Sequence, residues 1–122
     1  PPPRALYVVL RDVDPAHEDA FNRWQDEEAV AEQLTCPGFL GCERYEIASE
    51  SILPMPGEQA SLDQPNYMDV YDIETPEIVT NPVFWNMHCA PSRRATELAP
   101  HITVRGIGVY MQRPSPWALR PA

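Results

Sequence analysis

The chain alternates strand-like and helix-like apolar patterns in one order, and this order constrains its fold more than any other feature. A run rich in β-branched residues, 5–13 (ALYVVLRDV), predicts a first strand that ends at an Asp-Pro turn signal. Helical periodicity follows over 18–34 and stops before a Cys-Pro-Gly sequence, which breaks helices. A second strand is predicted over 39–47.

The second half of the sequence repeats this alternation. A third strand is predicted over 67–73, and it should pair with the second as an antiparallel hairpin. Thr75 and Asn81 are each followed by proline, so both are candidate helix N-caps. The second helical stretch should run from Val83 past Pro91 to Leu98, and the last strand covers 101–111. The order of elements is therefore βαββαβ.

This order predicts an α+β fold of the ferredoxin-like kind, a four-stranded antiparallel sheet with both helices on one face. The other face needs a cover, because the first strand is apolar on both sides: Leu6, Val8 and Leu10 alternate with Tyr7 and Val9. In the last strand, Ile102, Val104 and Tyr110 are predicted to face away from Ile107, Val109 and Met111. A second copy of the chain would bury the uncovered face, so we expect a homodimer.

Length and composition favour one domain over residues 1–122, with a long loop over 48–65 and a Pro-rich tail over 112–122. The net charge of -9 argues against nucleic-acid or anionic-membrane binding. No apolar run is long enough to span a bilayer and no signal-peptide pattern is present, so we expect a soluble cytoplasmic protein. The three cysteines have no CxxC spacing and are expected to be reduced.

Two stretches of the chain resemble a known group of proteins. Residues 17–46 (HEDAFNRWQDEEAVAEQLTCPGFLGCERYE) resemble the signature of the dimeric α-β barrel superfamily, particularly its EthD-like branch. Residues 66–85 (NYMDVYDIETPEIVTNPVFW) resemble the third strand of that branch and the entry to its second helix. The superfamily includes cofactor-free isomerases, cyclases, lyases and monooxygenases, so the resemblance implies a homodimer that binds a small apolar molecule without a cofactor.

The first helix departs from the EthD-like pattern at two positions. That pattern often reads WYDEEH, with the histidine facing the pocket in several enzymes, whereas the matching residues 24–29 read WQDEEA. Ala29 therefore replaces the histidine and Gln25 replaces the tyrosine. Chemistry that depends on this histidine cannot be carried over to the chain.

Four residues are candidates for catalysis. His88 lies among aromatic residues and could act as a general acid or base, although a structural or surface histidine has the same pattern. Glu28 shares a predicted helical stripe with Ala20, Phe21, Trp24, Ala31 and Leu34, where burial would raise its pKa; alternatively it reaches solvent at the border of the stripe. Asp69 and Tyr45 lie on the third and second strands and could line either the pocket or the dimer interface.

The candidate ligand-binding residues are Trp24, Gln25, Tyr71, Phe84 and Trp85. Trp24, Phe84 and Trp85 are alternatively core residues, and Tyr71 could instead line the dimer interface. No metal site is predicted, because His17 and His101 lie at the ends of predicted elements, where exposure is the default, and outside any close-spaced cluster of ligands. Gly106 and Gly108 lie within a strand, where glycines relieve crowding or mark a bulge.

These observations favour a cofactor-independent isomerase, cyclase or lyase that transfers protons on a small apolar, cyclic or aromatic compound. Two alternatives remain open. The chain could be a non-catalytic dimer that binds a small ligand or has a structural role, which the alanine at position 29 favours. It could also be a cofactor-free monooxygenase, which no motif specifically selects.

Overall fold

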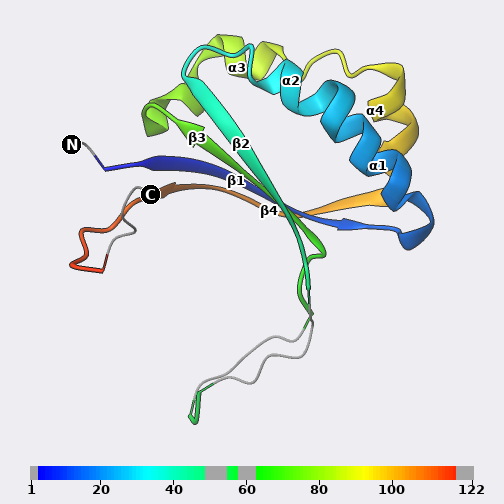
Figure 1. The fold of residues 1–122 in the computed structure, drawn as a ribbon. Coiled ribbons are helices and arrows are strands. Elements are labelled where there is room, and N and C mark those ends of the chain that lie inside the picture. The colour runs from blue at the N-terminus through cyan, green and yellow to red at the C-terminus, as the bar shows by residue number, and fades with distance from the viewer. Residues whose placement is uncertain (1–2, 49–54, 58–62, 118–122) are drawn as a thin grey trace.

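The computed structural model describes residues 3–48, 55–57 and 63–117, and its strands form a single four-stranded sheet (Figure 1). The strands are β1 (Ala5–Val13), β2 (Phe39–Glu46), β3 (Tyr67–Ile73) and β4 (Ile102–Met111). Their order is β2-β3-β1-β4 and every neighbouring pair is antiparallel. The predicted ferredoxin-like α+β fold, including the β2-β3 pairing, is confirmed.

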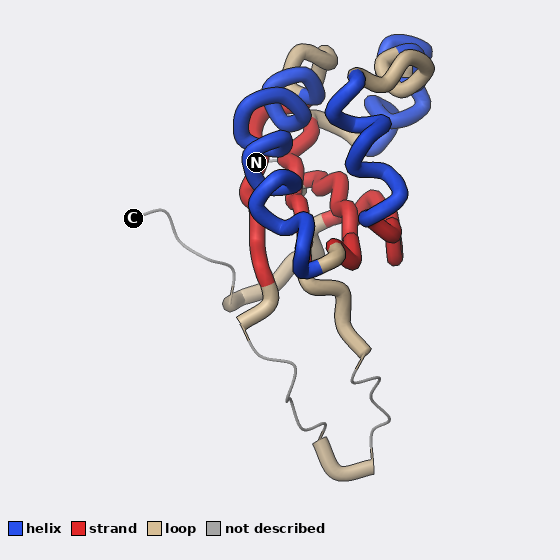
Figure 2. Tube along the Cα trace, turned by 90° about the vertical axis from the view of Figure 1, so that its right-hand side faces the viewer, coloured by secondary structure: helices blue, strands red, loops and turns tan. Residues whose placement is uncertain are grey.

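The described helices all lie on one face of the sheet, above it in the view of Figure 1 and in blue in Figure 2. They are α1 (Glu18–Trp24), α2 (Val30–Gln33), α3 (Pro82–Asn86) and α4 (Arg93–Leu98). A π-helical turn, Gln25–Ala29, joins α1 to α2, so the first helix is continuous. Short 3₁₀ turns cover Pro15–His17, Pro76–Thr80 and Ala99–His101.

The second helical stretch differs from its prediction. It is two helices, because α3 ends at Asn86 and α4 begins after Ser92, whose Oγ accepts a hydrogen bond from the Ala95 amide at 3.1 Å. Pro91 lies in the gap, and a proline ring inside a helix would clash with the preceding turn. Asn81 caps α3 as predicted, whereas the Thr75 side chain makes no capping hydrogen bond.

Aromatic rings fill the core between the sheet and the helices. Tyr7 lies at its centre, with ring centroids 5.8 Å from Phe39, 5.9 Å from Tyr71 and 5.4 Å from Phe84. Edge-to-face contacts of this kind stabilise a core beyond the area they bury. A second buried cluster surrounds the fully buried Phe21, which lies in α1.

A bulge in β4 changes which side chains share a face. Leu10 pairs with Gly106 but Arg11 pairs with Val104, so Arg105 is the extra residue. The predicted division of the last strand is therefore wrong. The apolar residues whose partners on β1 face the helices are Ile102, Val104, Ile107, Val109 and Met111, whereas Tyr110 faces away.

The face of the sheet without helices carries a set of apolar side chains, which we call the open face. Its members are Leu6, Val8, Leu10, Met68, Val70 and Tyr110. Gly108 makes room for one of them, since a Cβ there would lie 2.8 Å from the Tyr110 ring. The apolar character predicted for both faces of β1 is thus present, and none of the helices in the described residues lies over the open face.

Three further predictions can be compared with the described residues. The cysteines Cys36, Cys42 and Cys89 are all free thiols. None of the helices in the described ranges is both long and apolar enough to cross a membrane. Most of the predicted loop over 48–65 and the end of the predicted tail over 112–122 lie outside the described residues, and the assignment of one domain stays a prediction.

Candidate functional site

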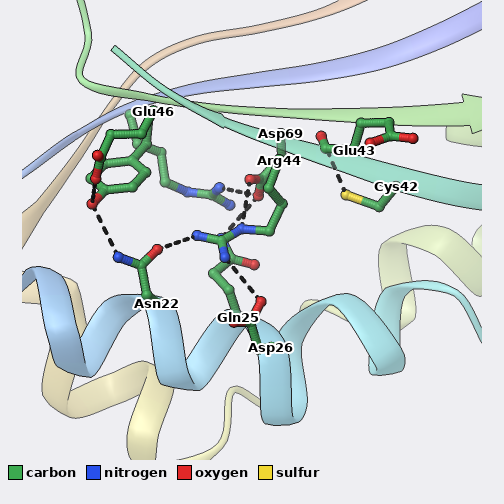
Figure 3. A network of polar contacts seen from close by, with 10 residues as sticks. Asn22, Gln25, Asp26, Cys42, Glu43, Arg44, Glu46 and Asp69 are labelled. Carbon is green, nitrogen blue, oxygen red and sulfur yellow. Dashed lines mark hydrogen bonds and ion pairs between the residues drawn. The ribbon is translucent and has the colours of Figure 1, made fainter. Parts of the chain in front are cut away.

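A buried carboxylate on β3 organises the polar groups between the sheet and the first helix. Asp69 is 1% exposed, and its Oδ2 accepts hydrogen bonds from Arg11 Nη1 at 2.6 Å and Gln25 Nε2 at 2.9 Å. Figure 3 shows Gln25 reaching from the helix toward this carboxylate. Hydrogen bonds and a cation compensate the cost of burying the charge, so Asp69 fixes both partners in place.

A second arginine approaches the same carboxylate from β2. Arg44 Nε lies 3.4 Å from Asp69 Oδ1, an ion-pair contact without hydrogen-bond alignment. The Arg44 guanidinium also donates to Asn22 Oδ1 at 2.6 Å and to Asp26 Oδ1 at 3.0 Å (Figure 3). Phe21 lies beneath both guanidinium groups, with centroid distances of 5.9 Å to Arg11 and 5.5 Å to Arg44.

The π-helical turn explains why Gln33 points inward. A π turn adds one residue to the helical repeat, so side chains after it rotate relative to a regular α-helix. Phe21, Gln25 and Gln33 are consequently the buried residues of this helix. The predicted stripe of Ala20, Phe21, Trp24, Glu28, Ala31 and Leu34 is wrong in part, since Ala20 and Ala31 are exposed.

A pocket of about 240 Å³ opens next to this network, between the sheet and the helices. Its lining residues are Arg11, Trp24, Gln25, Ala29, Glu32, Gln33, Tyr71, Met87, His88, Pro91, Ser92 and Ala95. Gln33 contributes a buried Nε2 that has no hydrogen-bond partner among the described residues. A buried donor without a partner is rare, and here a ligand in the pocket could accept its hydrogen bond.

The hydrogen bonding of His88 defines its proton-accepting atom. His88 Nδ1 lies 2.8 Å from the Phe84 carbonyl oxygen, which can only accept a hydrogen bond. The neutral imidazole therefore carries its proton on Nδ1 and leaves Nε2 with a free lone pair. Because His88 lines the pocket, this ring can act there as a base.

Tyr71 supplies a hydroxyl that remains protonated. Burial raises the pKa of its phenol well above the ordinary value of 10.0, and the neighbouring Cys42 and Asp69 raise it further. Tyr71 lines the pocket and can donate a hydrogen bond across the whole neutral range. Burial also raises the pKa of the Cys42 thiol, to about 11, which leaves that thiol un-ionised and a poor nucleophile.

The structure brings some of the predicted site residues together. Trp24, Gln25, Tyr71 and His88 line the pocket, and Asp69 lies behind it. Phe84 is 4% exposed and belongs to the aromatic core, which was its alternative interpretation. Ala29 also lines the pocket, where it presents a methyl group.

Other predicted residues lie apart from the pocket. The Glu28 side chain is 27% exposed, and its Oε2 lies 3.9 Å from Arg94 Nε. Tyr45 is 51% exposed, and its neighbour Arg44 faces the helices, so Tyr45 lies on the open face. Trp85 is 60% exposed and contacts the outer side of Phe84.

Sequence reasoning missed Arg11 and Gln33. Arg11 interrupts an otherwise apolar strand on the side that Tyr7 and Val9 share, and a charge at such a position was the available signal. Gln33 gave no comparable signal, because its inward position depends on the π turn.

Comparisons with known proteins support the fold and leave the chemistry open. No family model matches the chain, and no curated protein matches its sequence. Among solved structures, HapK from Hahella chejuensis aligns with a TM-score of 0.57 at 15% identity over 95% of this chain and 99% of its own. An EthD-family protein from Bacillus halodurans aligns with a TM-score of 0.50 at 13% identity over 87% and 96%.

Both similar structures agree with the resemblance read from residues 17–46 and 66–85. The chain has a ferredoxin-like fold, which it shares with these two structures. At these identities the similarity extends to the fold alone, so the function has to be argued from the pocket.

Proposed function

We propose that this chain is a cofactor-independent enzyme that transfers a proton on a small cyclic or aromatic carbonyl compound, as an isomerase, cyclase or lyase does. One observation carries the proposal: His88, with Nε2 free to accept a proton, lines the same pocket as the Arg11 guanidinium. A base and a cation facing one cavity are the groups that enolate chemistry needs.

The proposed step balances as a proton transfer. His88 Nε2 takes a proton from the carbon next to the substrate carbonyl, and the C–H electron pair moves toward the carbonyl oxygen. Arg11, Gln33 and Tyr71 stabilise the resulting enolate oxygen with hydrogen bonds. Return of the proton to another carbon isomerises the substrate, whereas expulsion of a leaving group makes the reaction a lyase reaction.

Asp69 acts through other residues in this scheme. Its hydrogen bonds to Arg11 and Gln25 hold both groups at the pocket wall before substrate arrives. Donors that are already in place need no reorganisation as charge develops, which is the main source of electrostatic catalysis. Asp69 is therefore a positioning residue, and Glu28, Tyr45 and Trp85 have no part in the proposed step.

The size and lining of the pocket support a small substrate. Cavities of about 150 Å³ hold a benzene-sized molecule, so about 240 Å³ suits one or two fused rings. Trp24 and Met87 provide apolar walls for such a compound, and Ala29 leaves room that a histidine would occupy.

Proton transfer can be detected without knowing the natural substrate. We would incubate the protein in D₂O with cyclic ketones such as 2-tetralone and follow loss of the α-proton NMR signals above the buffer rate. The wild type should accelerate exchange, and in His88→Ala this acceleration should be at least about 100-fold smaller. His101→Ala changes a residue outside the pocket and should keep the acceleration of the wild type. Equal exchange in the wild type and His88→Ala would contradict the role of His88.

A non-catalytic ligand-binding role is the second candidate. It is favoured by the partner of His88 Nδ1, which is a backbone carbonyl oxygen and not the carboxylate that commonly orients a catalytic histidine. Binding of the ketones without any exchange would support this role over the enzymatic one.

We also propose that two copies of the chain associate through their open faces. The support is physical: Leu6, Val8, Met68 and their neighbours form an apolar face that none of the described helices covers. The edge strand β4 adds Tyr110 to this face, and its side chain is 55% exposed.

A further inference from the structure

A second group of polar side chains lies at the end of the molecule where β1 finishes and β4 starts. Asp14 precedes the 3₁₀ turn that ends at His17, and His101 ends the 3₁₀ turn before β4. The Asp14 amide donates a hydrogen bond to the His101 carbonyl at 3.0 Å, which ties the two chain segments together. The imidazoles of His17 and His101 stack with centroids 3.5 Å apart and planes 8° apart.

Both imidazoles present the same nitrogen to one carboxylate oxygen. His17 Nδ1 lies 3.6 Å and His101 Nδ1 4.0 Å from Asp14 Oδ2. These separations are too long for hydrogen bonds. His17 Nδ1 is buried without a hydrogen-bond partner in the described part of the chain, and Asp14 Oδ1 is already used by the Ala16 amide at 3.1 Å. Three potential ligand atoms therefore converge without satisfying one another.

We propose that Asp14, His17 and His101 form a binding site for a divalent transition-metal ion of the Zn²⁺ type. Their ligand atoms lie within 4.8 Å of one another. Ligands of a tetrahedral zinc ion are about 3.3 Å apart, given metal–ligand distances of about 2.0–2.1 Å. A contraction of at most about 1.5 Å thus closes the site. Two imidazoles with one carboxylate are a ligand set that zinc, cobalt and nickel accept.

The two stacked rings have to rotate apart to bind one ion. In parallel imidazoles the in-plane lone pairs of the nitrogens point in parallel directions, so they do not meet at a single point. The His17 and His101 side chains are 35% and 36% exposed, so surrounding atoms leave room for this rotation. Both rings border a hollow of about 450 Å³ whose other charged lining residues are Arg23, Glu27, Arg94 and Glu97. The Asp14 side chain is 47% exposed, so solvent reaches the third ligand and water can complete the coordination of a bound ion.

Titration calorimetry with Zn²⁺, and the visible absorption of bound Co²⁺, test the site on the full chain. We expect one ion per chain, with binding weakened more than about 100-fold in His17→Ala and in His101→Ala. Asp14→Asn keeps an oxygen for the helix cap but removes the charge, and should weaken binding at least about tenfold. Circular dichroism of each variant separates lost ligands from lost structure.

Two controls use residues that lie outside the cluster. His88→Ala and Cys89→Ser remove other exposed groups that bind zinc and should leave the affinity unchanged. The proposal is overturned if the wild type shows no saturable binding, if folded His17→Ala and His101→Ala bind as tightly as the wild type, or if either control abolishes binding. These outcomes do not depend on the activity proposed for the other pocket.

Discussion

Asp69 is the residue on which the geometry of the proposed active site depends. Its carboxylate is almost fully buried, while the side chains of its partners Arg11 and Arg44 are only 18% and 19% exposed. Removing one member of a buried ion pair leaves charges without compensation and destabilises proteins by about 3–5 kcal/mol. We therefore expect Asp69→Asn to lower the free energy of unfolding by about 3 kcal/mol, measured by urea denaturation.

The same strand offers a matched control. Asp72 pairs with Arg4 at the surface, where both side chains are exposed, and exposed ion pairs contribute about 0–1 kcal/mol. Asp72→Asn should change the stability by less than about 1 kcal/mol. Similar losses for both substitutions would show that Asp69 is not a buried organising charge.

Tyr71 makes stability depend on alkaline pH. Burial raises the pKa of its phenol in the folded protein above 10.0, so the folded state holds this proton more tightly than the unfolded state. The resulting stabilisation is complete below about pH 10 and is lost as pH rises toward the folded pKa. Burial raises the pKa of Tyr67 and Tyr7 in the same direction.

Urea midpoints at about pH 8 and about pH 11 measure this effect. The wild type should lose stability between the two values, and Tyr71→Phe should lose less, because it has no phenol to ionise. An equal loss in both proteins would mean that Tyr71 ionises as easily in the folded state as in the unfolded state.

At the scale of elements, the turn from the first helix into β2 depends on a glycine. Gly38 has φ +91°, and a Cβ there would lie 1.9 Å from Ile78 Cδ1. Gly38→Ala should therefore destabilise the protein by about 2–3 kcal/mol, through backbone strain and overpacking. Gly41 is the control, because a Cβ added there would have no atom within 4 Å and its φ lies outside the left-handed region. Thermal unfolding of both alanine variants distinguishes them, and equal shifts would contradict this explanation.

The element order was predictable because it rests on long apolar patterns with clear breakers. The strands match their predicted ranges within one residue, as 101–111 against Ile102–Met111 shows. Local irregularities were not predictable. The π turn moved Gln33 inward and Glu28 toward Arg94, and a regular 3.6-residue repeat does not predict an inserted residue.

The β4 bulge had the same consequence for the sheet. One extra residue, Arg105, brought Ile107 onto the face of Val104 and broke the simple alternation of side chains. The location of the pocket was therefore predictable, whereas its lining residues were predictable only in part. His88 and Tyr71 follow from sequence patterns, whereas Gln33 and the pairing of His17 with His101 depend on irregular turns.

For the whole molecule, the open face leads to a prediction about assembly. Val8 lies in the middle of this face, between Val70 and Gly108 on the neighbouring strands. A charge there should prevent two sheets from packing, since it would be buried without a partner. Sedimentation velocity should show a dimer for the wild type and a monomer for Val8→Asp at micromolar concentration.

Ala31→Asp adds the same charge on the exposed side of the first helix and should remain dimeric. A wild type that sediments as a monomer, or a Val8→Asp variant that remains a folded dimer, would contradict association through the open face.

The proposed ligand site lies between the sheet and the helices, and an NMR titration locates a bound ligand directly. We predict that 2-tetralone shifts the amide signals of Gln25, Gln33 and His88 and the indole signal of Trp24, because these residues line the pocket. Shifts confined to the open face around Val8 and Tyr45, with the pocket signals unchanged, would contradict a ligand site in this pocket.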